Sequence, residues 1–286
     1  MAMKGNSELD TKTGIFRGIQ RAEYETIDAM NISTLINGVK SMAHLKQYMS
    51  ERREMTDALR IGIAVHIAVF EPSKTDSMFF VAPKRARRSN EDKAWWAEFE
   101  AKAQAESGIV LSEDEAATVF KMRDSLRACK PVREILDAQG VGEMAVVWKD
   151  EETGILCKGL VDRFCDWMGW PLIPDLKTCQ DASKDAFAKD VAKFHYGTKA
   201  SWYVDGLNSI HKCERRFVWI AIEKSLPHAV AMYEPDFQTM EEGRKVYRRL
   251  LNQYAEAKKT GIFPSYPEGI EPITLPKWAF EKEECA

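Results

Sequence analysis

The chain has 286 residues, 45% hydrophobic and 30% charged, with a net charge of −3, as in an ordinary globular protein of one large domain or two small ones. No apolar run approaches the roughly 20 residues of a membrane span, and the N-terminus lacks the apolar core of a signal peptide. We therefore expect a cytoplasmic protein with no membrane partner. The cysteines form no Cys-x-x-Cys pair, which argues against a zinc ribbon or a disulfide framework.

The first half of the sequence predicts mainly helices, after a start that looks irregular or weakly β. Apolar residues recur at helical spacing, and Thr56 can cap a helix that stops before Pro72. Ser112 and Glu115 form a capping box at the start of another helix. The helices of this half are expected at 33–49, 57–70, 90–106, 112–129 and from Pro131 onward.

The second half predicts strands that alternate with helices. Apolar, β-branched and aromatic runs are separated by turns such as Met168-Gly169. Strands are expected at 143–149, 155–167, 172–178, 216–223 and 228–234, and helices at 183–194, 199–210 and 236–259.

These elements predict an α/β (α+β) fold, in which a central mixed β-sheet is flanked by helices and carries an N-terminal helical elaboration. We expect a single domain over 1–286. Its mainly helical part, 1–140, carries His66; a catalytic sheet core follows at 141–260 and a tail at 261–286.

Two acidic residues and a lysine stand on neighbouring predicted strands. Asp175 and Lys177 alternate with Leu176, so both point to one face of their strand, and a hairpin can place Asp162 beside Asp175. Adjacent carboxylates repel unless a cation lies between them. Hard divalent cations use such carboxylates together with water and phosphate oxygens. The pattern therefore indicates metal-assisted hydrolysis of a phosphodiester, in which Lys177 orients or deprotonates the attacking water.

The order of these residues resembles the PD-(D/E)XK nuclease superfamily. Within it, the chain is similar to the C-terminal nuclease of RecE (exonuclease VIII) and to related phage exonucleases, from about Tyr24 to Trp278. The residues that carry the superfamily resemblance are Gly62, His66, Glu143, Asp162, Asp175, Lys177 and Tyr203. The closer resemblance rests on short strings at 148–157, 175–178, 203–206 and 275–279.

The resemblance implies a restriction-endonuclease-like core that hydrolyses double-stranded DNA ends with Mg²⁺, or with Mn²⁺. It also implies 5′-to-3′ digestion, which leaves a 3′ tail for a RecT-type single-strand annealing protein, and assembly into a homo-oligomeric ring that DNA threads. In this scheme Asp162, Asp175, the carbonyl of Leu176 and His66 are metal ligands. Lys177 acts on the water, Glu143 is linked to the metal, and Tyr203 supports the site and touches DNA.

The chain departs from the family pattern at three points. Val161 stands where the superfamily name has proline, and Lys199 replaces the glutamine of the Gln-x-x-x-Tyr motif. A lysine there can contact phosphate but cannot accept a hydrogen bond. Related iron–sulfur nucleases need clustered cysteines near the C-terminus, where this chain has only Cys285, so we expect no iron–sulfur cluster.

A basic cluster after Pro83 is a second candidate for DNA binding. It falls in a predicted loop, where clustered cations can neutralise phosphates. The residues expected to bind DNA are Lys84, Arg85, Arg87, Arg88 and Lys199.

Three other functions remain open on the same sequence. A structure-specific or single-strand endonuclease would cut a closed circle, which an exonuclease leaves intact. A non-catalytic DNA-end-binding protein would have no need of Asp162, Asp175 and Lys177 together. A small-molecule metal hydrolase would not bind DNA.

Overall fold

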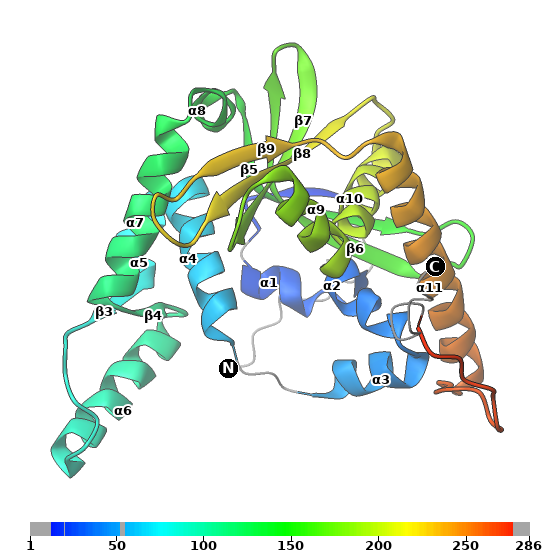
Figure 1. The fold of residues 1–286 in the computed structure, drawn as a ribbon, viewed down its shortest axis with the longest axis horizontal. Coiled ribbons are helices and arrows are strands. Elements are labelled where there is room, and N and C mark those ends of the chain that lie inside the picture. Colours follow the sequence, from blue (N-terminus) through cyan, green and yellow to red (C-terminus); the bar gives the residue numbers. More distant parts are fainter. Residues whose placement is uncertain (1–12, 20, 52–54, 277–286) are drawn as a thin grey trace, which may run out of the picture.

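A mixed β-sheet forms the centre of the molecule in the computed structural model, which describes residues 13–19, 21–51 and 55–276 (Figure 1). Within these residues, six of its seven strands follow the order β1-β5-β6-β7-β8-β9, and the seventh, β2, pairs with β6 off this path. Pairing is antiparallel except at β7–β8 and β2–β6. The strands are β1 (Gly14–Arg17), β2 (Met30–Asn31), β5 (Gly140–Lys149), β6 (Leu156–Trp167), β7 (Trp170–Cys179), β8 (Arg216–Glu223) and β9 (Val230–Tyr233).

Helices cover both faces of this sheet. Figure 1 shows α4 and α7 on one side and α10 and α11 on the other. The helices of the described residues are α1 (Arg21–Thr26), α2 (Ile32–Leu35), α3 (Met42–Ser50), α4 (Asp57–Phe70), α5 (Thr75–Met78), α6 (Asn90–Ala105), α7 (Glu113–Ala128), α8 (Lys130–Asp137), α9 (Lys184–Lys193), α10 (Tyr196–Ile210) and α11 (Phe237–Thr260). The predicted α/β arrangement, a mixed sheet flanked by helices, is confirmed.

Strand β8 shows how the two faces are built. Phe217, Trp219 and Ala221 pack into the core shared with α10 and α11, whereas Val218 and Ile220 pack into the core shared with α4 and α7. This period-2 alternation of apolar residues on both faces is typical of a strand buried between two helical layers.

The predicted helix starts have the expected caps. Thr56 accepts a hydrogen bond from Leu59 N at the start of α4, and α7 begins with the complete capping box of Ser112 and Glu115. Helix α4 ends at Phe70, before Pro72, whose ring cannot continue a helix.

The single helix predicted over 33–49 is wrong. The segment is divided into α2, a 3₁₀ turn (Ile36–Val39) and α3. Ser41 has an extended backbone and accepts a hydrogen bond from His44 N, so a new helix begins there. The local cap outweighs the continuous helical pattern of apolar residues.

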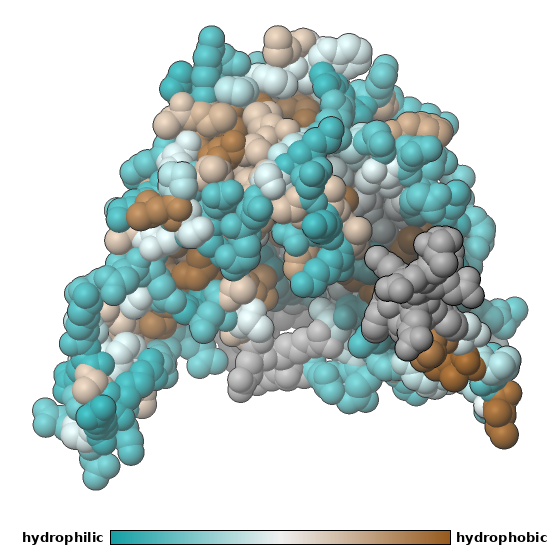
Figure 2. Space-filling view, viewed as in Figure 1, coloured by the Kyte–Doolittle hydropathy of each residue, from teal (hydrophilic) through white to brown (hydrophobic). Residues whose placement is uncertain are grey.

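A second, two-stranded sheet lies outside the predicted elements. Strands β3 (Phe79–Ala82) and β4 (Ile109–Ser112) pair in parallel, and α6 connects them. Figure 1 shows α6 projecting from the body as an arm, and Figure 2 shows mostly hydrophilic side chains over this projection.

Among the described residues, no helix combines the length and the apolar character needed to cross a lipid bilayer.

Candidate active site

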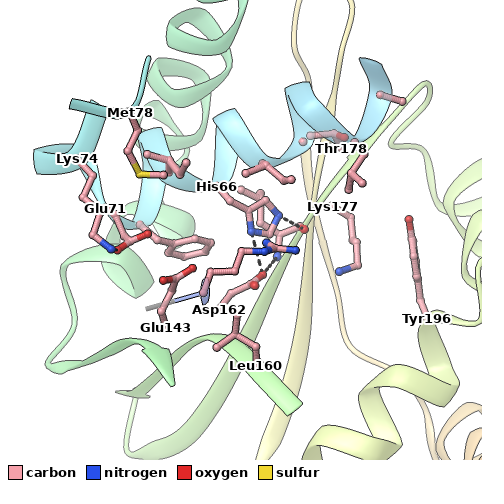
Figure 3. A pocket seen from close by; sticks show the side chains of 18 residues that line it. His66, Glu71, Lys74, Met78, Glu143, Leu160, Asp162, Lys177, Thr178 and Tyr196 are labelled. Atoms are coloured by element: carbon pink, nitrogen blue, oxygen red, sulfur yellow. Dashed lines mark hydrogen bonds and ion pairs between the residues drawn. The ribbon is translucent and has the colours of Figure 1, made fainter. Parts of the chain in front are cut away.

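The candidate site lies where α4 crosses the sheet between β6 and β7 (Figure 3). The β6–β7 ladder pairs Cys165–Trp167 with residues 170–172 and provides no backbone partner for the N–H of Leu176. The carboxylate of Asp162 takes that place, accepting from Leu176 N at 3.3 Å. The acid of one strand is thus fixed to the backbone of the next.

His66 comes from α4 and contacts two of the predicted metal ligands. Its Nδ1 lies 3.3 Å from Asp162 Oδ2, and its Nε2 lies 2.9 Å from the carbonyl oxygen of Leu176 (Figure 3). Both partners are acceptors, so a doubly protonated ring satisfies both contacts. Burial acts to lower the pKa of His66, but the Asp162 carboxylate outweighs it and raises that pKa. Burial would raise the pKa of Asp162, and the charge of His66 reverses this and lowers it.

Asp175 and Lys177 form a second, separate ion pair. Their Oδ2 and Nζ atoms are 2.5 Å apart, and Asp175 is 8% exposed. Burial raises the pKa of Asp175 despite the lysine beside it. Burial acts to lower the pKa of Lys177, but the attraction of Asp175 and Asp162 together raises it. Each acid of the site therefore has its own cation.

A cavity of about 340 Å³ opens beside these pairs. Its lining includes His66, Asp162, Leu176, Lys177 and Glu143. Burial raises the pKa of Glu143, and the neighbouring Glu71 adds to the effect. Figure 3 shows the Glu143 side chain on the wall between Asp162 and the Glu71–Lys74 ion pair. The sequence thus predicted five residues that the fold gathers around one cavity.

Tyr203 lies behind the strand that carries Asp162 and not in the cavity lining. Its ring packs against Gly159, where an added Cβ would lie 2.9 Å from the ring, and it stacks on Phe217. Burial raises the pKa of Tyr203 well above its usual value. The ring lies outside the cavity lining and supports β6, the strand that carries Asp162.

The basic cluster lies around a separate hollow of about 680 Å³ beside the start of α4. Arg85 forms an ion pair with Asp92, and Arg87 pairs with Glu100. The two guanidinium groups also lie over the rings of Trp95 and Trp96 in α6. The structure does not bring this cluster into the cavity of the candidate site. Lys84 is exposed and lies 3.5 Å from Asp114, and Arg88 is also exposed.

Several cavity-lining residues were absent from the sequence prediction, among them Tyr196 and Arg21. Tyr196 lies at the start of α10, and the ammonium groups of Lys177 and Lys199 lie 5.2 and 5.4 Å from its ring centre. Arg21 reaches the cavity from α1. The only sequence signal for Tyr196 is its position three residues before Lys199, where a predicted helix begins, and Arg21 has none.

The site offers atoms that could bind a hard divalent cation, and in this structure these atoms are hydrogen-bonded or ion-paired with neighbouring residues of the site. Among the described residues, no three His, Cys, Asp or Glu side chains are arranged as a ready metal site. Two carboxylates and the Leu176 carbonyl are nevertheless the oxygen donors that Mg²⁺ and Mn²⁺ accept, and the His66 imidazole lies beside two of these groups. The positive charges of His66 and Lys177 stand beside acids that a metal ion could neutralise in their place.

Comparison with known proteins bears on the fold and on the family of the chain. The solved structure of a protein from Eubacterium rectale, described as a "putative exonuclease", is 13% identical, covers 90% of this chain and 95% of its own, and superposes with a TM-score of 0.59. The structure of SSO0001 is 11% identical over 76% of this chain and 84% of its own, with a TM-score of 0.29, too low to support an argument. No curated protein matches the chain. The model of the family described as "PDDEXK-like domain of unknown function (DUF3799)" matches residues 32–276. The chain therefore belongs to this PDDEXK-like family, and its central sheet has the fold that the pattern of acids and lysine predicted.

Proposed function

We propose that this protein is a divalent-metal-dependent deoxyribonuclease that digests double-stranded DNA from its ends. The observation that carries the proposal is that His66, Asp162 and Lys177 line one cavity in a PDDEXK-like fold. Asp162 is paired with His66, and Lys177 is paired with Asp175, which lies outside the cavity lining. A module that only bound DNA would gain nothing from a buried acid and a partly buried one side by side, because taking charge out of water is costly even when it is paired.

In the proposed site the acids hold the metal and the lysine acts on water. Asp162, Asp175, the Leu176 carbonyl and His66 are the proposed ligands of Mg²⁺ or Mn²⁺. When bound, the ion would lower the pKa of water and neutralise charge on the phosphate. Lys177, held beside Asp175, would then be free to orient the attacking water and to stabilise the developing negative charge. Glu143 stands on the same wall, where its raised pKa suits proton transfer.

The finer assignment is 5′-to-3′ digestion that leaves a 3′ single-stranded tail for a RecT-type annealing protein. Its support is the resemblance to RecE-type nucleases and the description of the Eubacterium rectale protein as an exonuclease.

We also propose that the protein acts as a homo-oligomeric ring. The segment after α11 supports this, because Ile270 and Ile273 have almost fully exposed side chains that a second copy could cover. Light scattering measures the mass in solution and so tests the ring. A mass equal to one chain at micromolar concentration would rule out a homo-oligomeric ring.

The nuclease is tested on linear duplex DNA labelled at one 5′ end and on a closed circle of the same sequence. Each DNA is incubated with the wild-type protein in Mg²⁺ or in EDTA, and with the variants Lys177→Ala and Lys121→Ala in Mg²⁺. Lys121 is an exposed lysine on α7, and its variant serves as the control. We expect short labelled product from linear DNA only, lost in EDTA and in Lys177→Ala but kept in Lys121→Ala. A melting curve of each variant shows that loss of activity is not loss of fold.

The other outcomes select the alternatives. Cutting of the circle would identify an endonuclease on the same core. Binding of both DNAs without hydrolysis would leave a DNA-end-binding protein, and absence of binding would favour a small-molecule hydrolase.

A further inference from the structure

A row of aromatic rings runs from the core to the surface beside the candidate site. Phe187 is buried and stacks on Tyr233, with ring centres 5.3 Å apart. Tyr196 lies 6.1 Å from Phe187, and Phe194 stacks on Tyr196 at 5.6 Å. Phe194, at the outer end, is 42% exposed. The inner end of the row is thus fixed by packing, while its outer end is open to solvent.

The turn between α9 and α10 makes this stacking possible. His195, between the two rings, has φ of 55°, in the left-handed region that residues other than glycine rarely adopt. Within a helix, side chains two residues apart do not face each other. The reversal at His195 lets Phe194 and Tyr196 stack although one residue separates them. The strain at this residue therefore serves to hold the exposed ring against a ring that lines the cavity.

Two lysines, Lys193 and Lys199, lie against rings of the row. Lys193 Nζ lies 5.2 Å from the centre of the Phe194 ring. Lys199 is partly buried beside Tyr196, and burial together with Lys177 lowers its pKa to about 8. No ion pair joins Lys193 or Lys199 to any residue that the structure describes. Exposed aromatic rings combined with unpaired cations are the chemistry that single-stranded nucleic acids use, because bases stack on the rings while phosphates meet the charges.

We propose that Phe194 is a stacking site for an unpaired base of the DNA strand whose phosphate enters the cavity. The base extends the row of rings outward, and Lys199 meets the phosphate next to it. This inference rests on the proposed nuclease function and adds a subsite to it. A base in a paired duplex has both faces covered, so the subsite selects a frayed end or a single-stranded tail.

The subsite is tested by placing 2-aminopurine at the terminal positions of a short single-stranded tail on a duplex. Stacking on an aromatic ring quenches the fluorescence of this base. The measurement is made in EDTA with wild-type protein, and repeated with Lys177→Ala, so that no cleavage interferes. Phe194→Leu removes the ring but keeps an apolar side chain, and Phe194→Trp keeps a ring. Phe237→Leu, which changes an exposed phenylalanine at the start of α11, is the matched control.

We expect quenching with wild type, Phe194→Trp and Phe237→Leu, and its loss with Phe194→Leu. Because stacking on one aromatic ring changes affinity by about tenfold or more, Phe194→Leu should bind the tailed DNA roughly tenfold more weakly, as measured by anisotropy. The slope of log affinity against log salt should stay the same, since the cations that meet the phosphates are unchanged. Lys199→Met should instead flatten that slope.

Two results would overturn the subsite: equal quenching in Phe194→Leu and wild type, or equal losses in Phe194→Leu and Phe237→Leu. Hydrolysis assays separate this failure from that of the nuclease proposal. If the wild-type protein digests DNA but Phe194→Leu quenches the fluorescence as wild type does, only the stacking site is ruled out. Absence of digestion by wild type in Mg²⁺ removes the nuclease, while the fluorescence still reports whether a base binds at Phe194.

Discussion

At the scale of single residues, the candidate site consists of two acids that are held in different ways. Asp162 is ionised against His66 and a backbone N–H, whereas burial pushes the pKa of Asp175 upward despite Lys177. The two acids therefore differ in how readily they ionise. Asp162 carries its negative charge at little cost, whereas ionising Asp175 costs free energy because of its burial.

The first prediction concerns metal binding. Ca²⁺ or Mn²⁺ at ten to a hundred times its dissociation constant should raise the free energy of unfolding of wild type by about 1–3 kcal/mol. Asp162→Asn and Asp175→Asn should lose most of this gain, because each removes a charged ligand. Thermal melting with and without the ion measures it. Asp166→Asn, on the exposed side of β6, is the control and should respond as wild type does. An equal gain in all three variants would place the metal elsewhere.

At the scale of helices and strands, glycines decide how closely neighbouring elements pack. An added Cβ at Gly243 in α11 would lie 2.5 Å from the backbone oxygen of Gly197 in α10, and backbone cannot move aside as a side chain can. At Gly62 in α4 the nearest atom to an added Cβ would be Thr178 Oγ1, at 3.9 Å, an ordinary contact.

The second prediction compares these two glycines. Gly243→Ala should lower the free energy of unfolding by about 1–3 kcal/mol, since it forces α10 and α11 apart. Gly62→Ala should raise it by about 0.5–1 kcal/mol, because alanine costs less backbone entropy in a helix. Urea denaturation of both variants measures the changes. A stabilised Gly243→Ala would show that the two helices pack less closely than described.

The third prediction concerns pH and the ion pair that joins α4 to α7. Arg60 contacts both carboxylate oxygens of Glu115, at 2.6 and 2.9 Å, and the carbonyl of Val110. The hydrogen bond from Arg60 lowers the pKa of Glu115 from 4.5 to about 2, and burial opposes this only in part. Since the folded-state pKa is the lower one, the stabilisation is fully present above about pH 4.5 and fades as the pH falls towards 2.

Glu115→Gln should therefore lose about 1–2 kcal/mol at pH 7, a value reduced for partial exposure, and should approach wild type near pH 2–3. Glutamine can keep the capping box through its amide oxygen, but its amide nitrogen cannot accept from Arg60, so the substitution removes the charge and one of the two hydrogen bonds. Urea denaturation at pH 7, 5 and 3 gives the comparison, with Glu113→Gln as the control on the same helix. A difference that does not change with pH would contradict the assigned ion pair.

Elements with a strong local signal could be predicted from the sequence, and those fixed by distant contacts could not. The capping box at Ser112 and the apolar run that carries Asp175 are local patterns, so the helix and the strand that they mark could be predicted without knowledge of distant contacts. Strands β3 and β4 have four residues each, too few to show a period, and their pairing depends on the intervening α6. Strand β2 has only two residues and forms because β6 offers an edge to it.

Some residues of the candidate site could likewise be predicted from the sequence, and others could not. His66, Asp162 and Lys177 belong to a spaced pattern along the sequence, so their meeting could be predicted. Tyr196 enters the cavity only because α10 begins three residues earlier than the 199–210 segment predicted from the sequence. Tyr203, predicted from the same pattern, lies behind β6, because Gly159 leaves room for its ring there.

At the scale of the whole molecule, the basic cluster lies beside the arm formed by α6, outside the cavity lining of the candidate site. Arg85 and Arg87 hold the arm together through Asp92, Glu100 and the two tryptophan rings. Lys84 has only a long contact with an exposed acid, which is worth little, and Arg88 forms no ion pair with a described residue. Within the cluster, Lys84 and Arg88 are the residues available to DNA.

The fourth prediction separates these two pairs. Lys84→Ala with Arg88→Ala should flatten the slope of log affinity for DNA against log salt by about 0.9 for each phosphate that the protein no longer neutralises. Arg85→Ala with Arg87→Ala should instead loosen the arm, seen as faster hydrogen exchange in α6, with a smaller effect on that slope. Anisotropy between about 50 and 200 mM salt, a range over which phosphate binding weakens strongly, measures the first effect. An unchanged slope in both double variants would remove the cluster from the DNA interface.

Strand β1 pairs Gly14–Arg17 with residues 144–147 of β5, so the first strand of the sheet finds its partner more than a hundred residues later. During synthesis on the ribosome, at about 5–20 residues per second, β1 must wait on the order of ten seconds before β5 exists. An unpaired strand edge is prone to join other chains during that time. The brevity of β1 and β2, four and two residues, limits this risk, because neither strand alone offers another chain a long edge to extend.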